Sequence, residues 1–120
     1  MDADVLEAAA AVEGDRVESR LDSGLTYFDG GPPVEVLVRR RPGRYLVSDD
    51  GSAVEVAGRP AGWREVADDV IAAHGLNVNR RGVVSVPAVP RQGAAWLDSL
   101  TACVADASLA LYEALLELDE

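Results

Sequence analysis

The sequence predicts an α+β domain, with a mainly antiparallel sheet, helices packed on one face and the element order αβββαββα. Three observations predict it. Two stretches combine strand-like apolar residues with turn residues, as β-hairpins do. Two stretches repeat apolar residues at helical spacing, and the longer of them closes the chain. At 120 residues the chain has the size of one domain, so residues 1–120 are treated as a single domain.

The clearest hairpin lies in the first half of the chain. Valine occupies every second position from Val34 to Val38, which is the period of a strand with one buried face, and Leu37 lies on the other face. Pro42-Gly43 then supplies the two residue types that a tight turn favours. The chain reverses there into a second strand, Tyr45–Ser48.

The other elements follow from local periodicity and from turn residues. Residues Val17 to Leu21 fit either an extension of the first helix or the beginning of a strand. The remaining expected elements are a first helix at Ala3–Glu13, a short strand at Leu25–Phe28, a short extended piece at Ala53–Val56, a helix at Ala61–His74, a second hairpin of Leu76–Val78 and Val83–Val86, and a last helix at Gln92–Leu118.

The last helix is apolar over more than one stripe of its surface. A helix of this kind either fills a deep groove of its own domain or packs against a second molecule. We predict a homodimer on this basis. Its expected dimer face consists of Trp96, Leu100, Val104, Leu111 and Leu115.

Charge and composition limit the possible partners and compartments. The net charge is −10, and residues 98–120 hold acids but no base, so nonspecific binding to phosphate backbones is disfavoured. The single cysteine, Cys103, excludes an internal disulfide and fits a reducing cytoplasm. The acidic N-terminus is unlike a secretory signal, and no apolar run is long enough to predict a membrane span. We therefore expect a cytoplasmic protein without a membrane partner.

Arginines cluster at the two hairpin turns, and no lysine is present. Clustered guanidinium groups bind phosphates or carboxylates through paired hydrogen bonds, although arginines at turns are also commonly just solvated. Our topology places the two tips at opposite ends of the sheet, which argues against one joint patch. The candidate contacts to a partner or anion are Arg39, Arg40, Arg41, Arg44, Arg80 and Arg81.

No motif predicts catalysis, a cofactor or a metal site. Asp49 and Asp50 precede Gly51 and are interpreted as turn-forming residues, because a metal would need further ligands. His74 is interpreted as a helix-end residue and Cys103 as a structural thiol on an apolar helix face. The serines lack a G-x-S-x-G context and the glycines lack phosphate-loop spacing. We therefore predict that the protein is not an enzyme.

Several stretches resemble the bacterial domain-of-unknown-function family 1828. That family has a T-P-F strand, an apolar strand and a Y-x-L-T-D-D-G hairpin, followed by a helix, a G-V strand and a terminal helix. This chain departs from the family with Tyr27 in place of proline and Ser48 in place of threonine. The resemblance covers most of residues 17–115 and implies no established activity. It is carried by Leu25–Asp29, Val34–Val38, Tyr45–Gly51, His74–Val78 and the predicted last helix.

The predicted order of elements is also similar to that of type III secretion chaperones, which bind partner polypeptides and catalyse no reaction. This architectural likeness implies a protein-binding, chaperone-like module that acts as a homodimer. The alternative is a nucleic-acid-associated factor, related to a phage or mobile element, that uses the arginine-rich turns. A salt-dependent affinity for DNA or RNA would favour the alternative.

Overall fold

The structure is a computed structural model that describes residues 18–41, 44–88 and 93–119. The predicted first helix, Ala3–Glu13, lies outside the described residues. The described elements are β1 (Glu18–Thr26), β2 (Pro33–Arg41), β3 (Arg44–Ser48), α2 (Ser52–Val56), α3 (Trp63–Ala73), β4 (Asn77–Val78), β5 (Val84–Ala88), α4 (Gly93–Leu116) and the short 3-10 helix η2 (Glu117–Asp119).

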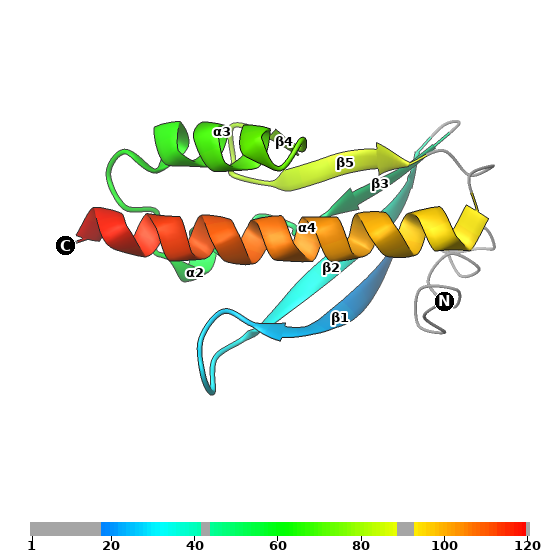
Figure 1. Ribbon diagram of the computed structural model, residues 1–120, viewed down its shortest axis with the longest axis horizontal. Coiled ribbons are helices and arrows are strands. Elements are labelled where there is room, and N and C mark those ends of the chain that lie inside the picture. Colours follow the sequence, from blue (N-terminus) through cyan, green and yellow to red (C-terminus); the bar gives the residue numbers. More distant parts are fainter. Residues whose placement is uncertain (1–17, 42–43, 89–92, 120) are drawn as a thin grey trace.

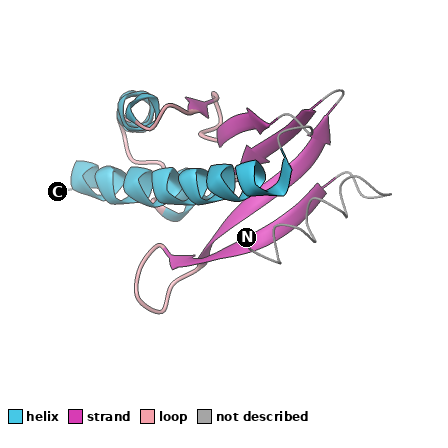
Figure 2. Ribbon diagram, turned by 45° about the vertical axis from the view of Figure 1, so that its right-hand side comes forward, coloured by secondary structure: helices cyan, strands magenta, loops and turns pink. Residues whose placement is uncertain are grey.

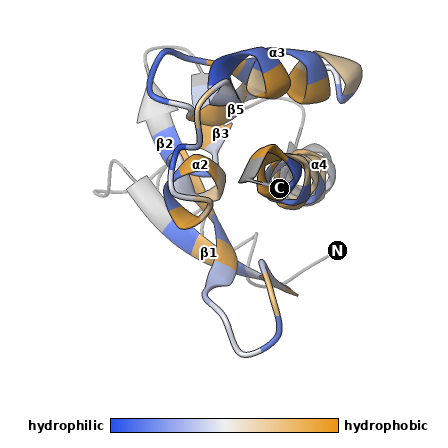
Figure 3. Cartoon of the chain, turned by 90° about the vertical axis from the view of Figure 1, so that its left-hand side faces the viewer, coloured by the Kyte–Doolittle hydropathy of each residue, from blue (hydrophilic) through white to orange (hydrophobic). Residues whose placement is uncertain are grey.

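The five described strands form one sheet in the order β1-β2-β3-β5-β4, and every neighbouring pair is antiparallel. Helix α4 lies across one face of this sheet along the length of the domain (Figures 1 and 2). Seen from the end, α2 and α4 lie on the same side of the sheet, with α3 beside α4 (Figure 3). The predicted α+β class with an antiparallel sheet is therefore confirmed.

The central hairpin has the predicted alternation. Val38 lies opposite Val47 in the register, and both valines are fully buried. The side chain of Leu37 points to the other face of the sheet, where it is only 1% exposed. The β2–β3 pair therefore buries apolar side chains on both of its faces.

The first described strand extends further toward the N-terminus than predicted. Leu21, which the sequence left open between helix and strand, pairs with Val36 inside β1. The strand is irregular near its end, where Gly24 has φ 84° and its N–H donates to Asp22 Oδ1 at 2.8 Å. The predicted strand at Leu25–Phe28 was misplaced, since β1 ends at Thr26.

The predicted extended piece at Ala53–Val56 is wrong, because this segment is the helix α2. The carbonyl of Asp49 accepts hydrogen bonds from the N–H of Ser52 at 3.2 Å and from its hydroxyl at 2.9 Å, which turns the chain into a helix. Ala53 and Val54 are then fully buried in the core. Tertiary packing has overridden the local strand preference of valine here.

Helix α3 and the second hairpin form close to their predicted positions. Helix α3 ends at Ala73 with His74 as its C-cap, and Gly75 follows in the left-handed conformation with φ 74°. The short strand β4 pairs with β5 through Val78 and Val84. The helical spacing and the turn residues were therefore sufficient to predict both elements.

The predicted dimer face is wrong for the residues that the structure describes. Val104, Leu111 and Leu115 are fully buried within the single chain, and Leu100 is half-buried at the edge of the same core. The side chain of Trp96 lies outside the described part. Helix α4 is apolar around much of its girth because it packs against the sheet on one side and against α2 and α3 on others. Helix α4 therefore fills a groove of its own domain, which is the first of the two alternatives that its sequence left open.

By length and composition alone, the segment Ser99–Leu116 of α4 is apolar enough to cross a membrane. The core helix of a globular domain passes the same test. In this fold 44% of the segment is buried, and its apolar composition is accounted for by the core.

Candidate functional site

The two predicted arginine clusters lie at opposite ends of the sheet. In the β3–β5 register Tyr45 pairs with Ala88 and Ser48 pairs with Ser85, so the β4–β5 turn projects from the end of the sheet far from the β2–β3 turn. The backbone positions of Arg41 and Arg44 pair at that other end. The six candidate arginines therefore form no joint patch.

Two arginines that the sequence analysis did not select lie beside the β4–β5 turn. Arg59 donates from Nη2 to the carbonyl of Arg81 at 3.1 Å, and Arg64 donates from Nη2 to the carbonyl of Arg80 at 3.2 Å. The guanidinium carbons of Arg59 and Arg64 lie 5.4 and 5.6 Å from the ring centroid of Trp63, within the range of cation–π attraction. We call these five residues the arginine–tryptophan surface.

Local sequence fixes the shape of the turn that carries Arg80 and Arg81. Asn79 Oδ1 accepts hydrogen bonds from the N–H of Arg81 at 2.9 Å and of Val83 at 3.0 Å. Gly82 has φ 84°, and a Cβ added there would lie 2.6 Å from Cγ2 of Val54. Only glycine allows this close approach, so the turn is held firmly against the domain.

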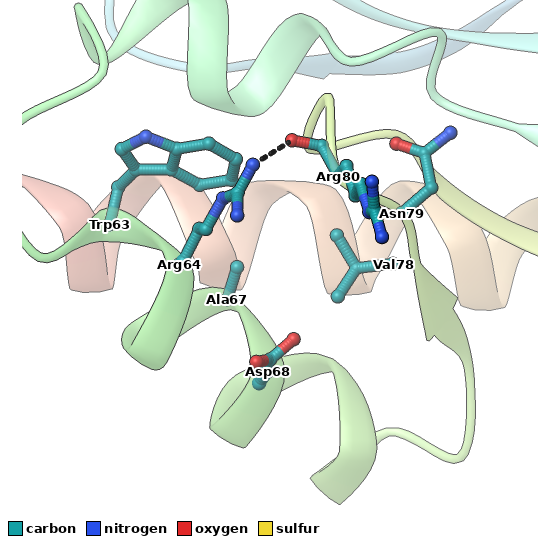
Figure 4. Close-up of a pocket in the computed structure, with 7 residues that line it drawn as sticks. All are labelled: Trp63, Arg64, Ala67, Asp68, Val78, Asn79 and Arg80. Carbon is teal, nitrogen blue, oxygen red and sulfur yellow. Dashed lines mark hydrogen bonds between the residues drawn. The ribbon is translucent and has the colours of Figure 1, made fainter.

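A shallow pocket of about 160 Å³ opens on this surface (Figure 4). Its walls combine apolar groups with charged groups. Ala67 is buried, Trp63 and Val78 are half-buried, and the charged side chains are exposed. The pocket is lined by Trp63, Arg64, Ala67, Asp68, Val78, Asn79 and Arg80.

The charges on this surface are only partly neutralised. Arg59 forms an ion pair with Glu55 at 2.8 Å. Within the described ranges, the guanidinium groups of Arg80 and Arg81 and the carboxylate of Asp68 form no ion pair. Arg64 also forms no ion pair there, so three exposed cations remain available to an anionic group, on a chain whose net charge is −10.

A second polar region lies inside the domain, behind the same turn. Asp49 is 1% exposed, and its Oδ1 accepts hydrogen bonds from the N–H of Gly51 at 2.8 Å and of Val84 at 2.9 Å. Its Oδ2 lies 2.7 Å from the hydroxyl of the fully buried Ser108. The hydroxyl of Tyr27 lies 2.7 Å from that of Ser108 and also bonds that of Ser52.

The contacts of this buried network form a closed ring. They run from Asp49 Oδ2 to Ser108, from Ser108 to Tyr27, from Tyr27 to Ser52, and from Ser52 to the Asp49 carbonyl. Each of the four contacts needs one proton, and the three hydroxyl groups supply three. An ionised Asp49, which accepts from Ser108 at Oδ2, therefore leaves one of the four contacts without a proton, and a proton bound to Asp49 would supply it.

The environment of the carboxyl group acts in the same direction. Burial raises the pKa of Asp49 above its ordinary value, and it outweighs the lowering effect of the bonds from Ser108, Gly51 and other donors. Burial likewise raises the pKa of Tyr27. The network lies mostly inside the core, with Ser52 half-buried, and it ties the ends of β1 and β3 to β5, α2 and α4.

The other selected residues stand apart from both regions. Asp50, in the left-handed conformation with φ 58°, forms an exposed ion pair with Arg20 at 3.0 Å. His74 Nδ1 lies 3.0 Å from the carbonyl of Val70 at the end of α3, and Cys103 is a free, half-buried thiol. In the described part of the chain, no three His, Cys, Asp or Glu side chains come together in a way that could hold a metal ion.

The chain matches no family model, and it has no significant match among curated proteins or among solved structures. The resemblances to the bacterial family and to secretion chaperones therefore stay predictions. The spacing of Arg59, Trp63 and Arg64 was a signal that the sequence analysis could have used, because two cations flank one aromatic residue within six positions.

Proposed function

We propose that the protein is a small cytoplasmic binding module that recognises an acidic partner polypeptide and catalyses no reaction. The observation that carries this proposal is the arginine–tryptophan surface. Two of its arginines, Arg59 and Arg64, lie over the half-buried indole, and the guanidinium groups of Arg80 and Arg81 have no ion-pair partner within the described residues. Arginine and tryptophan are the residues that most often contribute strongly to protein interfaces.

The character of the exposed groups supports binding rather than catalysis. Guanidinium groups stay protonated at any physiological pH, so they hold anions and do not transfer protons. The hydroxyl and carboxyl groups that lie within hydrogen-bond distance of one another around Asp49 are buried or half-buried and bonded to each other, which supports a structural role for them.

The homodimer stays part of the proposal, although its predicted face is buried. The exposed large hydrophobic residues among those described are Phe28, Leu116 and Leu118. The ring of Phe28 lies 6.2 Å from that of Tyr112 on α4. We propose that a dimer uses this end of α4. Light scattering of the wild type and of a Phe28→Ser, Leu116→Ser variant tests it: the variant is expected to be monomeric, and a monomeric wild type would refute the dimer.

Affinity capture from native cytoplasm tests the binding module with two matched variants. Arg80→Glu with Arg81→Glu reverses the charge at the β4–β5 turn. Arg41→Glu with Arg44→Glu makes the same change of net charge at the opposite end of the sheet. We expect one stoichiometric protein partner that the first variant loses and the second retains.

The other outcomes of this capture are equally decisive. Loss of the partner only with the second variant would move the binding site to the β2–β3 turn. Nucleic acid that leaves with added salt would replace the proposal with the nucleic-acid-associated alternative. Retention of the partner by both variants would show that the four substituted arginines take no part in recognition.

A further inference from the structure

The pocket on the arginine–tryptophan surface combines two kinds of wall, and each kind selects a different part of a ligand. Trp63 and Ala67 from α3 and Val78 from β4 form its apolar part (Figure 4). Its volume of about 160 Å³ is close to the roughly 150 Å³ that encloses a benzene-sized group in an apolar cavity. The apolar part therefore has room for one aromatic or branched aliphatic side chain.

The charged part of the pocket selects an anion of limited charge. Arg80 has no ion-pair partner in the described ranges, and Arg64 is held in place by its bond to the Arg80 carbonyl. A carboxylate that approaches these two groups can form charge-assisted hydrogen bonds. Asp68 lines the same pocket with its own negative charge, and it repels a phosphate more strongly than a single carboxylate.

We propose that this pocket binds a short acidic peptide segment in which an apolar side chain lies next to a carboxylate. The apolar side chain packs on Trp63 and Val78, and the carboxylate pairs with Arg80 and Arg64. Asp68 is the specificity-determining residue that disfavours phosphate backbones and accepts a hydrogen bond from a peptide N–H. The proposal rests on the proposed binding function and names the chemistry of its partner.

The pocket can be tested directly with synthetic probes, without knowledge of the partner. The probes are the capped peptide Glu-Glu-Leu-Glu-Glu, its serine analogue with the leucine replaced, its glutamine analogue with all four acids replaced, and an oligothymidylate. Binding is followed in ¹H–¹⁵N NMR spectra through the indole signal of Trp63 and the amide signals of Val78 and Arg80. The indole is assigned with Trp63→Phe.

Of the four probes, we expect only the peptide Glu-Glu-Leu-Glu-Glu to bind. Its chemical-shift changes should be confined to the Trp63 indole and the Val78 and Arg80 amides. Arg80→Gln should weaken its binding about tenfold, as expected for loss of one charge-assisted hydrogen bond. Because the Arg80 side chain is exposed and makes no described bond to the fold, the thermal midpoint of this variant should stay unchanged. Equal binding of the serine analogue would remove the apolar anchor and overturn the proposal.

The role of Asp68 has its own control on the same helix. Asp68→Asn should allow the oligothymidylate to bind, whereas Asp69→Asn, which changes an exposed carboxylate outside the pocket lining, should not. Identical behaviour of the two variants would refute the role of Asp68. If no peptide binds but cytoplasmic capture still depends on Arg80 and Arg81, the binding module stands and this pocket proposal falls.

Discussion

The two polar regions of this protein lie on either side of one turn and are built in opposite ways. The network around Asp49 has its polar groups paired, and Asp49, Ser108 and Tyr27 are buried. The arginine–tryptophan surface keeps three guanidinium groups, those of Arg64, Arg80 and Arg81, without an ion pair in the described structure. The Asp49 segment holds the turn by a two-way bond with Val84, since Asp49 N–H donates to the Val84 carbonyl at 3.0 Å. Satisfied polar groups thus form the frame, and the groups without an ion pair lie on the surface for which we propose ligand binding.

This comparison predicts that substitutions in the network cost stability, whereas exposed arginines can be changed without unfolding the protein. The largest effect is expected for Asp49→Ala. The change leaves the N–H groups of Gly51 and Val84 and the hydroxyl of Ser108 without their acceptor, and the free energy of unfolding should fall by ~3–5 kcal/mol. Urea denaturation measures it.

The neighbouring carboxylate is the control for that experiment. Asp50→Asn removes an exposed ion pair to Arg20 and keeps a side chain that tolerates positive φ, so a loss below ~1 kcal/mol is expected. Comparable losses for the two variants would mean that the ring around Asp49 contributes nothing beyond a turn.

Gly82→Ala tests whether the frame and the surface are mechanically joined. The added Cβ would lie 2.6 Å from Cγ2 of Val54 and 3.2 Å from the Trp63 ring, in a conformation with φ 84°. We expect a loss of ~2 kcal/mol in the free energy of unfolding, together with a shifted indole signal of Trp63. Gly58→Ala, also at positive φ but with nothing within 4 Å, is the control that keeps the strain and removes the clash.

Tyr27→Phe removes one hydroxyl from the ring and leaves Ser108 and Ser52 without that partner. The expected loss is ~1–2 kcal/mol in the free energy of unfolding, measured by urea denaturation. Tyr112→Phe is the matched control, because Tyr112 is a buried tyrosine on α4 whose hydroxyl has no described hydrogen bond. An equal loss for both variants would assign the effect to ring packing instead of to the hydrogen bonds.

Much of the fold could be predicted from the sequence, because its signals are local. The alternation from Val34 to Val38 and the helical spacing in α3 each reflect one buried face. The failures have a common cause in long-range packing. The valine-rich segment of α2 becomes helical because of the turn at Asp49, and the wide apolar girth of α4 is covered by the sheet and by other helices of the same chain.

The candidate site was less predictable for the same reason. The interpretation of Asp49 as a turn-forming residue agrees with its bond to Gly51 two positions on. Its burial and its bond to Ser108, 59 positions away, have no local signal. Likewise Arg59 and Arg64 reach the β4–β5 turn only because the connection between α2 and α3, and α3 itself, lie beside that turn.

The smallest effect, expected at about pH 4, and the sharpest test of the ring concern the protonation of Asp49. Burial raises the pKa of Asp49 in the folded state, whereas the carboxyl group of the unfolded chain titrates near the ordinary value of 3.8. As pH rises from about 4 toward the folded pKa, the unfolded state loses the proton first, so stability falls with rising pH over that window. Within the described residues, Tyr27 is the other titratable group in the ring, and its own raised pKa keeps it neutral there.

Asp49→Asn isolates this contribution. The amide N–H₂ can donate to the Ser108 hydroxyl, and the amide oxygen can still accept from Gly51 and Val84, so we expect a change below ~1 kcal/mol at about pH 4. The free energy of unfolding of the wild type, minus that of Asp49→Asn, should decrease as pH rises above about 4. An increase instead would show that Asp49 is folded as a carboxylate. The ring would then contain one contact without a proton. The network around Asp49 would then not be fully paired, and its contrast with the arginine–tryptophan surface would be wrong.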